Sequence, residues 1–187
     1  LTGIYSAYKS GALYSGYLTL CPDIQSDLVY AVKGNSNTYG RFWQWEVRST
    51  DSELSAVYGS LYTVIGRCNF FLEKVGELKA GMTDDDEITA LDYYTGEVYC
   101  ARALAYSELI KCFCKAYEPA TAENELGLVL ADSYFKPAPE TRANLKESYE
   151  FVLADLAKAD EYLDEDDNAY NAIYPKNAAV HALWARV

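Results

Sequence analysis

The fold is decided by the stretch TDSELSAVYGSLYTVIGRCNFFLEKVG, residues 50–76. Its apolar side chains recur every three or four residues, which is the spacing of one face of an α-helix; they are Leu54, Val57, Leu61, Ile65, Cys68, Leu72 and Val75. Thr50 and Glu53 have the spacing of a capping box, which predicts the start of the helix. Gly76 and Gly81 bracket its end. We therefore expect one long helix, covered on more than one side.

Two more long helices follow. The next begins after Thr83, where residues 84–87 are all acidic, and its apolar face continues to about Tyr117. Acidic side chains stabilise the amino-terminal end of a helix dipole, so we interpret this cluster as a cap rather than a metal site. A further helix starts near Asn144, with Glu147 in the capping-box position, and runs to Leu163.

Shorter apolar runs lie at both ends of the chain. Residues 1–8 predict a short helix, and Asn177 is expected to cap a last one whose stripe continues to Val187. Trp184 lies in that stripe and is expected in the core. Because the stripe is unfinished, we expect the chain to have been cut within this helix. The fold class is therefore all-α, with residues 1–187 forming a single helical domain.

Residues 9–49 differ from the rest of the chain. They are rich in Gly, Ser, Asn and Tyr and carry Trp43 and Trp45. We interpret them as a long irregular connection with local turns rather than a sheet. Long connections inside a helical domain are often functional.

Composition limits the function. The chain has 187 residues, 50% of them hydrophobic, with 18 Tyr and a formal net charge of −12. An acidic protein repels phosphate backbones and anionic lipids, so nucleic acid is not an expected partner, whereas a neutral ligand remains possible. No stretch approaches the roughly 18 apolar residues that a membrane-spanning helix needs.

Nothing in the sequence predicts a metal or a cofactor. The five cysteines are irregularly spaced and His181 is the only histidine, so we interpret the cysteines as small buried hydrophobic residues. Four acids at 164–167 follow a helix end. They could bind calcium through oxygen ligands but lack the spacing and glycine of an EF-hand, so a solvated turn is favoured and calcium stays open.

Four helical segments resemble the SusD/RagB family, in the order and rough spacing of that family. They are AVYGSLYTVIGRCNFFLEKV (56–75), GEVYCARALAYSELIKCF (96–113), SYEFVLADLAKADEYL (148–163) and PKNAAVHALWARV (175–187). LTGIYSAY at residues 1–8 is similar to the family's opening helix. One departure is Cys114, which stands where the family usually has Gly.

The resemblance implies tetratricopeptide-like helix pairs and a non-enzymatic protein. It further implies glycan binding for nutrient uptake, together with a TonB-dependent (SusC-like) transporter on which this helical region packs. A lipid anchor absent from this chain would hold the protein on the surface of the outer membrane. Full-length members are longer, so the resemblance implies that this chain is the amino-terminal part of such a protein. The carboxy-terminal part of the members commonly contributes to the glycan site.

The best local candidate for glycan binding is NTYGRFWQWEV, residues 37–47. Aromatic rings pack on the C–H face of a sugar, while polar side chains bind its hydroxyl groups at roughly 1 kcal/mol net each. The expected ligand-binding residues are Tyr39, Arg41, Phe42, Trp43 and Trp45, with Asn37 and Gln44 as polar neighbours. In an extended stretch the two tryptophans would share one side. Alternatively, both tryptophans pin the segment to the helices.

Three polar residues are expected to be structural. We interpret Asn69 as a hydrogen-bonding residue on a crowded helix, and Arg102 and Arg186 as ion-pair or carbonyl anchors between helices.

Two other functions compete with glycan capture. The first is a tetratricopeptide-like scaffold that binds proteins and ignores glycans. The second is a glycosidase with two catalytic acids. The sequence contains 28 acidic residues, so pairs of acids are inevitable and uninformative, and no nucleophile or phosphate-binding motif is present.

Overall fold

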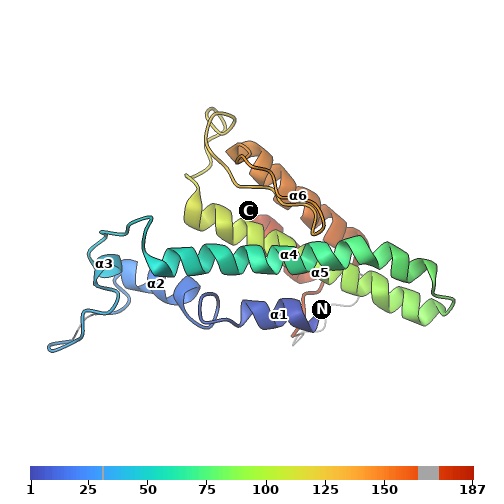
Figure 1. Ribbon diagram of the computed structural model, residues 1–187, viewed down its shortest axis with the longest axis horizontal. Helices are drawn as coiled ribbons and strands as arrows, with labels where there is room; N and C mark the ends of the chain where they lie inside the picture. Colours follow the sequence, from blue (N-terminus) through green and yellow to red (C-terminus); the bar gives the residue numbers. More distant parts are fainter. Residues whose placement is uncertain (31, 164–172) are drawn as a thin grey trace. The chain divides into compact units, whose positions relative to one another are not determined.

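The computed structural model describes residues 1–30, 32–163 and 173–187, and these residues form helices and no strand (Figure 1). The helices are α1 (Thr2–Tyr8), α2 (Tyr17–Gln25), α3 (Gly40–Trp43), α4 (Ser52–Ala80), α5 (Asp85–Phe113), α6 (Leu145–Tyr162) and α7 (Asn177–Arg186). The all-α fold is thus confirmed. The chain divides into two compact units, Thr2–Thr63 and Val64–Val187, the second of which includes Leu1. The single-domain boundary 1–187 stays a prediction.

In the unit that begins at Val64, α5 packs against α6, and α6 against α7. The small residues Ala101, Ala103 and Ala105 of α5 are all buried. Gly96 shows how closely the elements approach, because a Cβ added there would lie 2.8 Å from both Leu163 Cγ and Tyr162 Cβ. Only glycine fits this contact without a shift of its neighbours.

Two helix starts are built as the sequence predicts. The Asp84 side chain accepts hydrogen bonds from the backbone N–H groups of Asp86 and Glu87 at the start of α5. Asn144 and Glu147 form a reciprocal capping box at the start of α6. These caps satisfy N–H groups that have no partner inside the helix.

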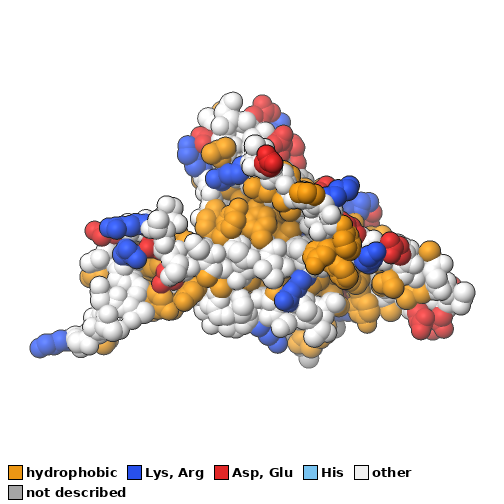
Figure 2. Space-filling model, viewed as in Figure 1, with side chains coloured by type: hydrophobic (Ala, Val, Ile, Leu, Met, Phe, Trp, Pro, Cys, Tyr) orange, Lys and Arg blue, Asp and Glu red, His pale blue; other side chains and the backbone are white. Residues whose placement is uncertain are grey.

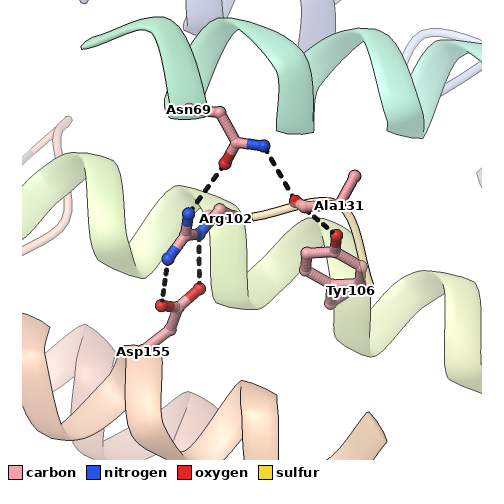
Figure 3. A network of polar contacts seen from close by, with 5 residues as sticks. All are labelled: Asn69, Arg102, Tyr106, Ala131 and Asp155. Carbon is pink, nitrogen blue, oxygen red and sulfur yellow. Dashed lines mark hydrogen bonds and ion pairs between the residues drawn. The ribbon is translucent and has the colours of Figure 1, made fainter. Parts of the chain in front are cut away.

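A buried polar network connects three helices and one loop of this unit (Figure 3). Arg102 of α5 donates through Nε and Nη2 to the carboxylate of Asp155 in α6, at 2.8 and 2.6 Å. Its Nη1 donates to Asn69 Oδ1 of α4 at 2.7 Å. The amide of Asn69 and the hydroxyl of Tyr106 both donate to the carbonyl of Ala131, at 2.8 and 2.9 Å. The structural roles predicted for Asn69 and Arg102 are confirmed.

Arg186 is also confirmed as an anchor between helices. Its Nη2 lies 2.8 Å from Oε1 of Glu108, a buried carboxylate on α5. His181 of α7 lies on an exposed helix face, with Nε2 2.7 Å from Asp160 Oδ1.

In the unit Thr2–Thr63, the connection 9–49 contains two helices that the sequence analysis did not predict. Helix α2 carries Pro22 in its interior and is only nine residues long, which hid its periodicity. Its buried residues Cys21 and Ile24 form a small core with Phe42 of α3. Partly buried Tyr17, Leu20, Tyr39, Val47 and Leu54 pack around that core.

Three predictions about particular residues are wrong. Helix α4 begins at Ser52, so Asp51 rather than Thr50 directly precedes it. Asn177 is the first residue of α7 and does not cap it, because its amide donates to Asp160 Oδ1 and to the Leu163 carbonyl. Trp184 is exposed rather than in the core.

All five cysteines are free thiols. Cys21, Cys68 and Cys100 are buried as expected, but Cys112 is exposed and Cys114 is only partly buried. Helix α5 ends at Phe113 rather than near Tyr117, which leaves this pair at the edge of the unit's core.

Candidate functional site

The segment from Tyr39 to Trp45 is a single helical turn bounded by two bends. Tyr39 precedes α3 with φ 59°, and Trp45 follows it with φ 60°. A left-handed backbone is unfavourable for bulky side chains, at a cost on the order of 1–3 kcal/mol each. Such conformations persist only where surrounding contacts impose them, and they concentrate at functional sites.

These bends determine which side chains face solvent. Phe42 points into the small core and is 3% exposed, whereas Trp43 and Trp45 are 48% and 68% exposed. The interpretation that both tryptophans pin the segment to the helices is therefore not supported. The extended stretch is also wrong, because Trp43 ends a helical turn and Trp45 follows in a left-handed bend.

Phe42 is a correction to the candidate site. Its side chain is 3% exposed and packs with Cys21 and Ile24, so the ring supports the segment from behind and offers a ligand almost no surface, although the residue borders the hollow described below. The sequence pattern missed this because one helical turn, unlike a strand, places neighbouring side chains about 100° apart.

Contacts on both sides hold Tyr39 and Arg41. The ring of Tyr39 packs edge-on against Tyr17 of α2, with ring centroids 6.1 Å apart. Arg41 Nη2 lies 2.7 Å from Oδ1 of Asp51, while Asp51 Oδ2 accepts a hydrogen bond from the Arg48 backbone N–H at 2.8 Å. Asp51 is buried and Arg41 is half-exposed, so this ion pair closes the loop from 41 to 51.

A shallow hollow of about 350 Å³ lies beside this ion pair. Its lining offers an amide, a phenol, a guanidinium and two carboxylates, with residues Asn37, Tyr39, Gly40, Arg41, Phe42, Asp51 and Glu53. These groups can donate and accept hydrogen bonds to a polyhydroxyl ligand. The structure thus brings Tyr39 and Arg41 together at one hollow, whereas Trp43 and Trp45 do not line it.

A second exposed aromatic group was not found from the sequence. Phe70 of α4 contacts Tyr134 and Phe135, with ring centroids 5.1 and 6.0 Å apart, and all three rings are about half exposed. The Tyr134 backbone N–H donates to Glu73 Oε1 at 2.9 Å, and Lys74 Nζ lies 5.2 Å from the Phe135 ring centroid. We call Phe70, Tyr134 and Phe135 the three-ring cluster.

The three-ring cluster exposes aromatic side chains to solvent. On the face drawn in Figure 2, hydrophobic side chains reach the surface between acidic and basic ones. Exposed aromatic groups of this kind are typical of interaction surfaces. Phe70 lies more than sixty positions before the adjacent Tyr134 and Phe135 in the sequence, so no local signal reveals the cluster.

Neither a metal-binding group of side chains nor a membrane-spanning helix is found in the described part of the chain. Residues 1–30, 32–163 and 173–187 contain no group of three or more His, Cys, Asp or Glu arranged to hold a metal ion. The acidic turn at 164–167, where calcium was left open, lies outside the described residues. None of the helices described is both long and apolar enough to span a bilayer.

Comparison with known proteins gives a consistent family. Residues 3–187 match a SusD-like family model described as starch-binding and associating with the outer membrane. Over 190 residues the chain is 26% identical to SusD-like protein P2 of Formosa agariphila, covering all of this chain and 34% of that protein.

Solved structures share the fold. A SusD superfamily protein of Bacteroides thetaiotaomicron superposes with a TM-score of 0.75 at 20% identity, covering 98% of this chain and 39% of that one. A laminarin-binding SusD-like protein gives 0.69 at 16% identity, covering 99% and 37%. The tetratricopeptide-like helical fold is therefore confirmed. The chain spans little more than a third of the length of these relatives.

Proposed function

Because the chain belongs to the SusD-like family, we propose that the protein captures glycans at the cell surface, and that the segment 39–45 contributes to the binding surface. Tyr39, Arg41, Trp43 and Trp45 are the residues proposed to contact the sugar. The observation that carries this proposal is the exposure of Trp43 and Trp45 on a turn anchored by Phe42 and by the Arg41–Asp51 ion pair.

This geometry suits sugar binding for two physical reasons. An indole ring held at the surface offers a flat apolar face to sugar C–H groups and loses little conformational freedom on binding. The neighbouring hollow supplies the polar groups that hydroxyls need. Since each polar contact replaces one made with water, the net gain per contact is small, and binding is expected to be weak and distributed.

The same contacts favour capture over catalysis. In the hollow, Asp51 is already committed to Arg41 and to the Arg48 backbone, so it is a poor candidate for one of the two acids of a glycosidase. The family description, starch-binding, also favours binding over hydrolysis.

The proposal extends to the location and partner of the protein. The family is described as associating with the outer membrane, which supports a surface lipoprotein that delivers glycans to a TonB-dependent, SusC-like transporter. The three-ring cluster is a candidate contact for such a partner, because exposed aromatic side chains are enriched in protein interfaces.

That cluster also favours the alternative function, a helical scaffold that binds proteins and ignores glycans. The two functions differ in one measurable respect. Only the proposed function requires the intact protein to be retained by a polysaccharide.

Affinity electrophoresis of the intact protein in gels with and without neutral polysaccharides tests the proposal. Retardation by at least one polysaccharide is expected, with loss of retardation in Trp43→Ala and Trp45→Ala. Trp184→Ala is the matched control, because Trp184 is also exposed but lies on α7. Retardation unchanged in both segment variants, or absent for every polysaccharide, would contradict the proposal.

A further inference from the structure

The charged groups of the hollow are unequally matched. One guanidinium, that of Arg41, faces two carboxylates, those of Asp51 and Glu53. The hollow therefore carries a net negative charge, in a chain that is itself strongly acidic. A ligand in the hollow interacts mainly with these nearby charges, because salt largely screens charges that lie more than about 10 Å away.

The positive charge of Arg41 is already balanced by a buried carboxylate. Its Nη2 is 2.7 Å from Asp51, whose side chain is only 1% exposed. Breaking this pair would leave a buried carboxylate without its cation, which is strongly unfavourable. The guanidinium therefore stays paired with Asp51, and its charge does not offset the additional negative charge of Glu53.

The amino-terminal end of α4 is a second feature that could attract an anion, and Glu53 lies there. It lies in the first turn of α4, where the helix dipole favours negative charge. Its Oε2 accepts a hydrogen bond from Ser52 Oγ at 3.1 Å, and no ion pair to Glu53 is formed within the described residues. Glu53 therefore complements the helix end with its own charge and presents that charge to the hollow.

We infer that Glu53 sets the charge selectivity of this hollow, so that it accepts neutral glycan units and rejects units bearing a carboxylate or sulfate. This inference rests on the proposed function, since it assigns a ligand class to the same surface. Removing the charge of Glu53 would leave the hollow with one guanidinium and one carboxylate, so an anionic unit would no longer meet an excess of negative charge there.

The variant that tests this is Glu53→Gln, which keeps the size and hydrogen-bonding capacity of the side chain. Glu46→Gln is the matched control, because Glu46 is exposed in the same segment and does not line the hollow. The probes are a neutral gluco-oligosaccharide and a galacturonate oligosaccharide of equal length. Their affinities for the intact protein are measured by calorimetry at low and high salt, after thermal melts verify folding.

The unmodified protein is expected to bind the neutral probe and to discriminate against the galacturonate. Glu53→Gln should raise galacturonate affinity by roughly fivefold at low salt, as removal of one like charge near 4 Å in water predicts, and high salt should reduce this gain. Glu46→Gln should leave it unchanged.

Two results overturn the inference and leave the proposed function intact. They are equal binding of both probes by the unmodified protein, and galacturonate affinity that Glu53→Gln does not change. Absence of binding by every neutral glycan tested would instead contradict the proposed function itself, and the selectivity with it.

Discussion

Arg102 and Asp155 form a two-bond ion pair between α5 and α6 in which both side chains are less than one-tenth exposed. Burial raises the pKa of the Asp155 carboxyl, and the hydrogen bonds and charge of Arg102 oppose that rise. Each partner therefore makes burial of the other tolerable. This dependence gives a direct prediction about stability.

Arg102→Ala should lower the free energy of unfolding by about 3–5 kcal/mol, because it leaves a buried carboxylate unpaired. The double variant Arg102→Met, Asp155→Leu should recover much of that loss, since apolar groups need no partner. Urea unfolding measures both. Lys158→Ala is the control, because its ion pair with Glu161 is exposed and its removal should barely move the unfolding midpoint. A double variant less stable than Arg102→Ala would contradict the account.

The shared carbonyl of Ala131 gives a second prediction. Tyr106→Phe or Asn69→Ala alone leaves this carbonyl one hydrogen bond, so each should cost about 1 kcal/mol, with more for Asn69 because it also bonds Arg102. Together they leave the carbonyl without a side-chain donor. The double variant should therefore lose more stability than the two single losses combined. Urea unfolding of the four proteins gives this coupling, and strict additivity would show that the two donors act independently.

Local signals in the sequence were sufficient for the long helices. Asp84 and Asn144 cap the helices that they were expected to cap, because a cap needs only residues within a few positions. Asn69 and Arg102 were recognised as structural because a polar residue on a crowded helix needs a partner. Their actual partners, Ala131 and Asp155, were beyond what spacing can reveal.

Local signals failed where a distant partner decides the conformation. Asn177 has the chemistry of a cap, but its side chain donates instead to Asp160 in α6 and to the carbonyl of Leu163, which directly follows α6. At the candidate site, the sequence identified an aromatic segment but not its backbone. Residue type does not predict the left-handed backbone of Tyr39 or the helical turn after it, in which Phe42 faces the core and Trp43 faces solvent.

Phe42 is buried and the adjacent Trp43 is exposed, which leads to a third prediction, on the stability of their alanine variants. Phe42→Ala should destabilise the protein by about 3–5 kcal/mol if its unit unfolds cooperatively, because it empties a buried ring position. Trp43→Ala should change stability by no more than about 0.5 kcal/mol, as is usual for an exposed side chain. Thermal and urea unfolding compare these adjacent residues directly. A large loss for Trp43→Ala would assign its ring to the core and remove it from the binding surface.

The two buried thiols of Cys68 and Cys100 lead to a last prediction, on how the free energy of unfolding changes at alkaline pH. Burial raises the pKa of Cys68 and of Cys100 from 9.0 to about 12 each. Below pH 9 both thiols keep their protons in the folded and unfolded states, so pH has no effect through them. Between pH 9 and 12 the unfolded chain releases protons that the folded chain retains. The free energy of unfolding must therefore fall as pH rises, by up to about 1.4 kcal/mol per pH unit for each thiol.

Urea unfolding at several pH values from about 8 to 11 measures this slope. Cys68→Ala and Cys100→Ala should each make it shallower, whatever stability they lose at neutral pH, because the slope reports proton release rather than packing. In the variant that carries both Cys68→Ala and Cys100→Ala, the free energy of unfolding should still fall with pH above pH 10, since burial also raises the pKa of the Tyr106 hydroxyl. Equal slopes in the unmodified protein and both variants would mean that water reaches these thiols in the folded state, and that the packing around Cys68 and Cys100 is looser than their burial indicates.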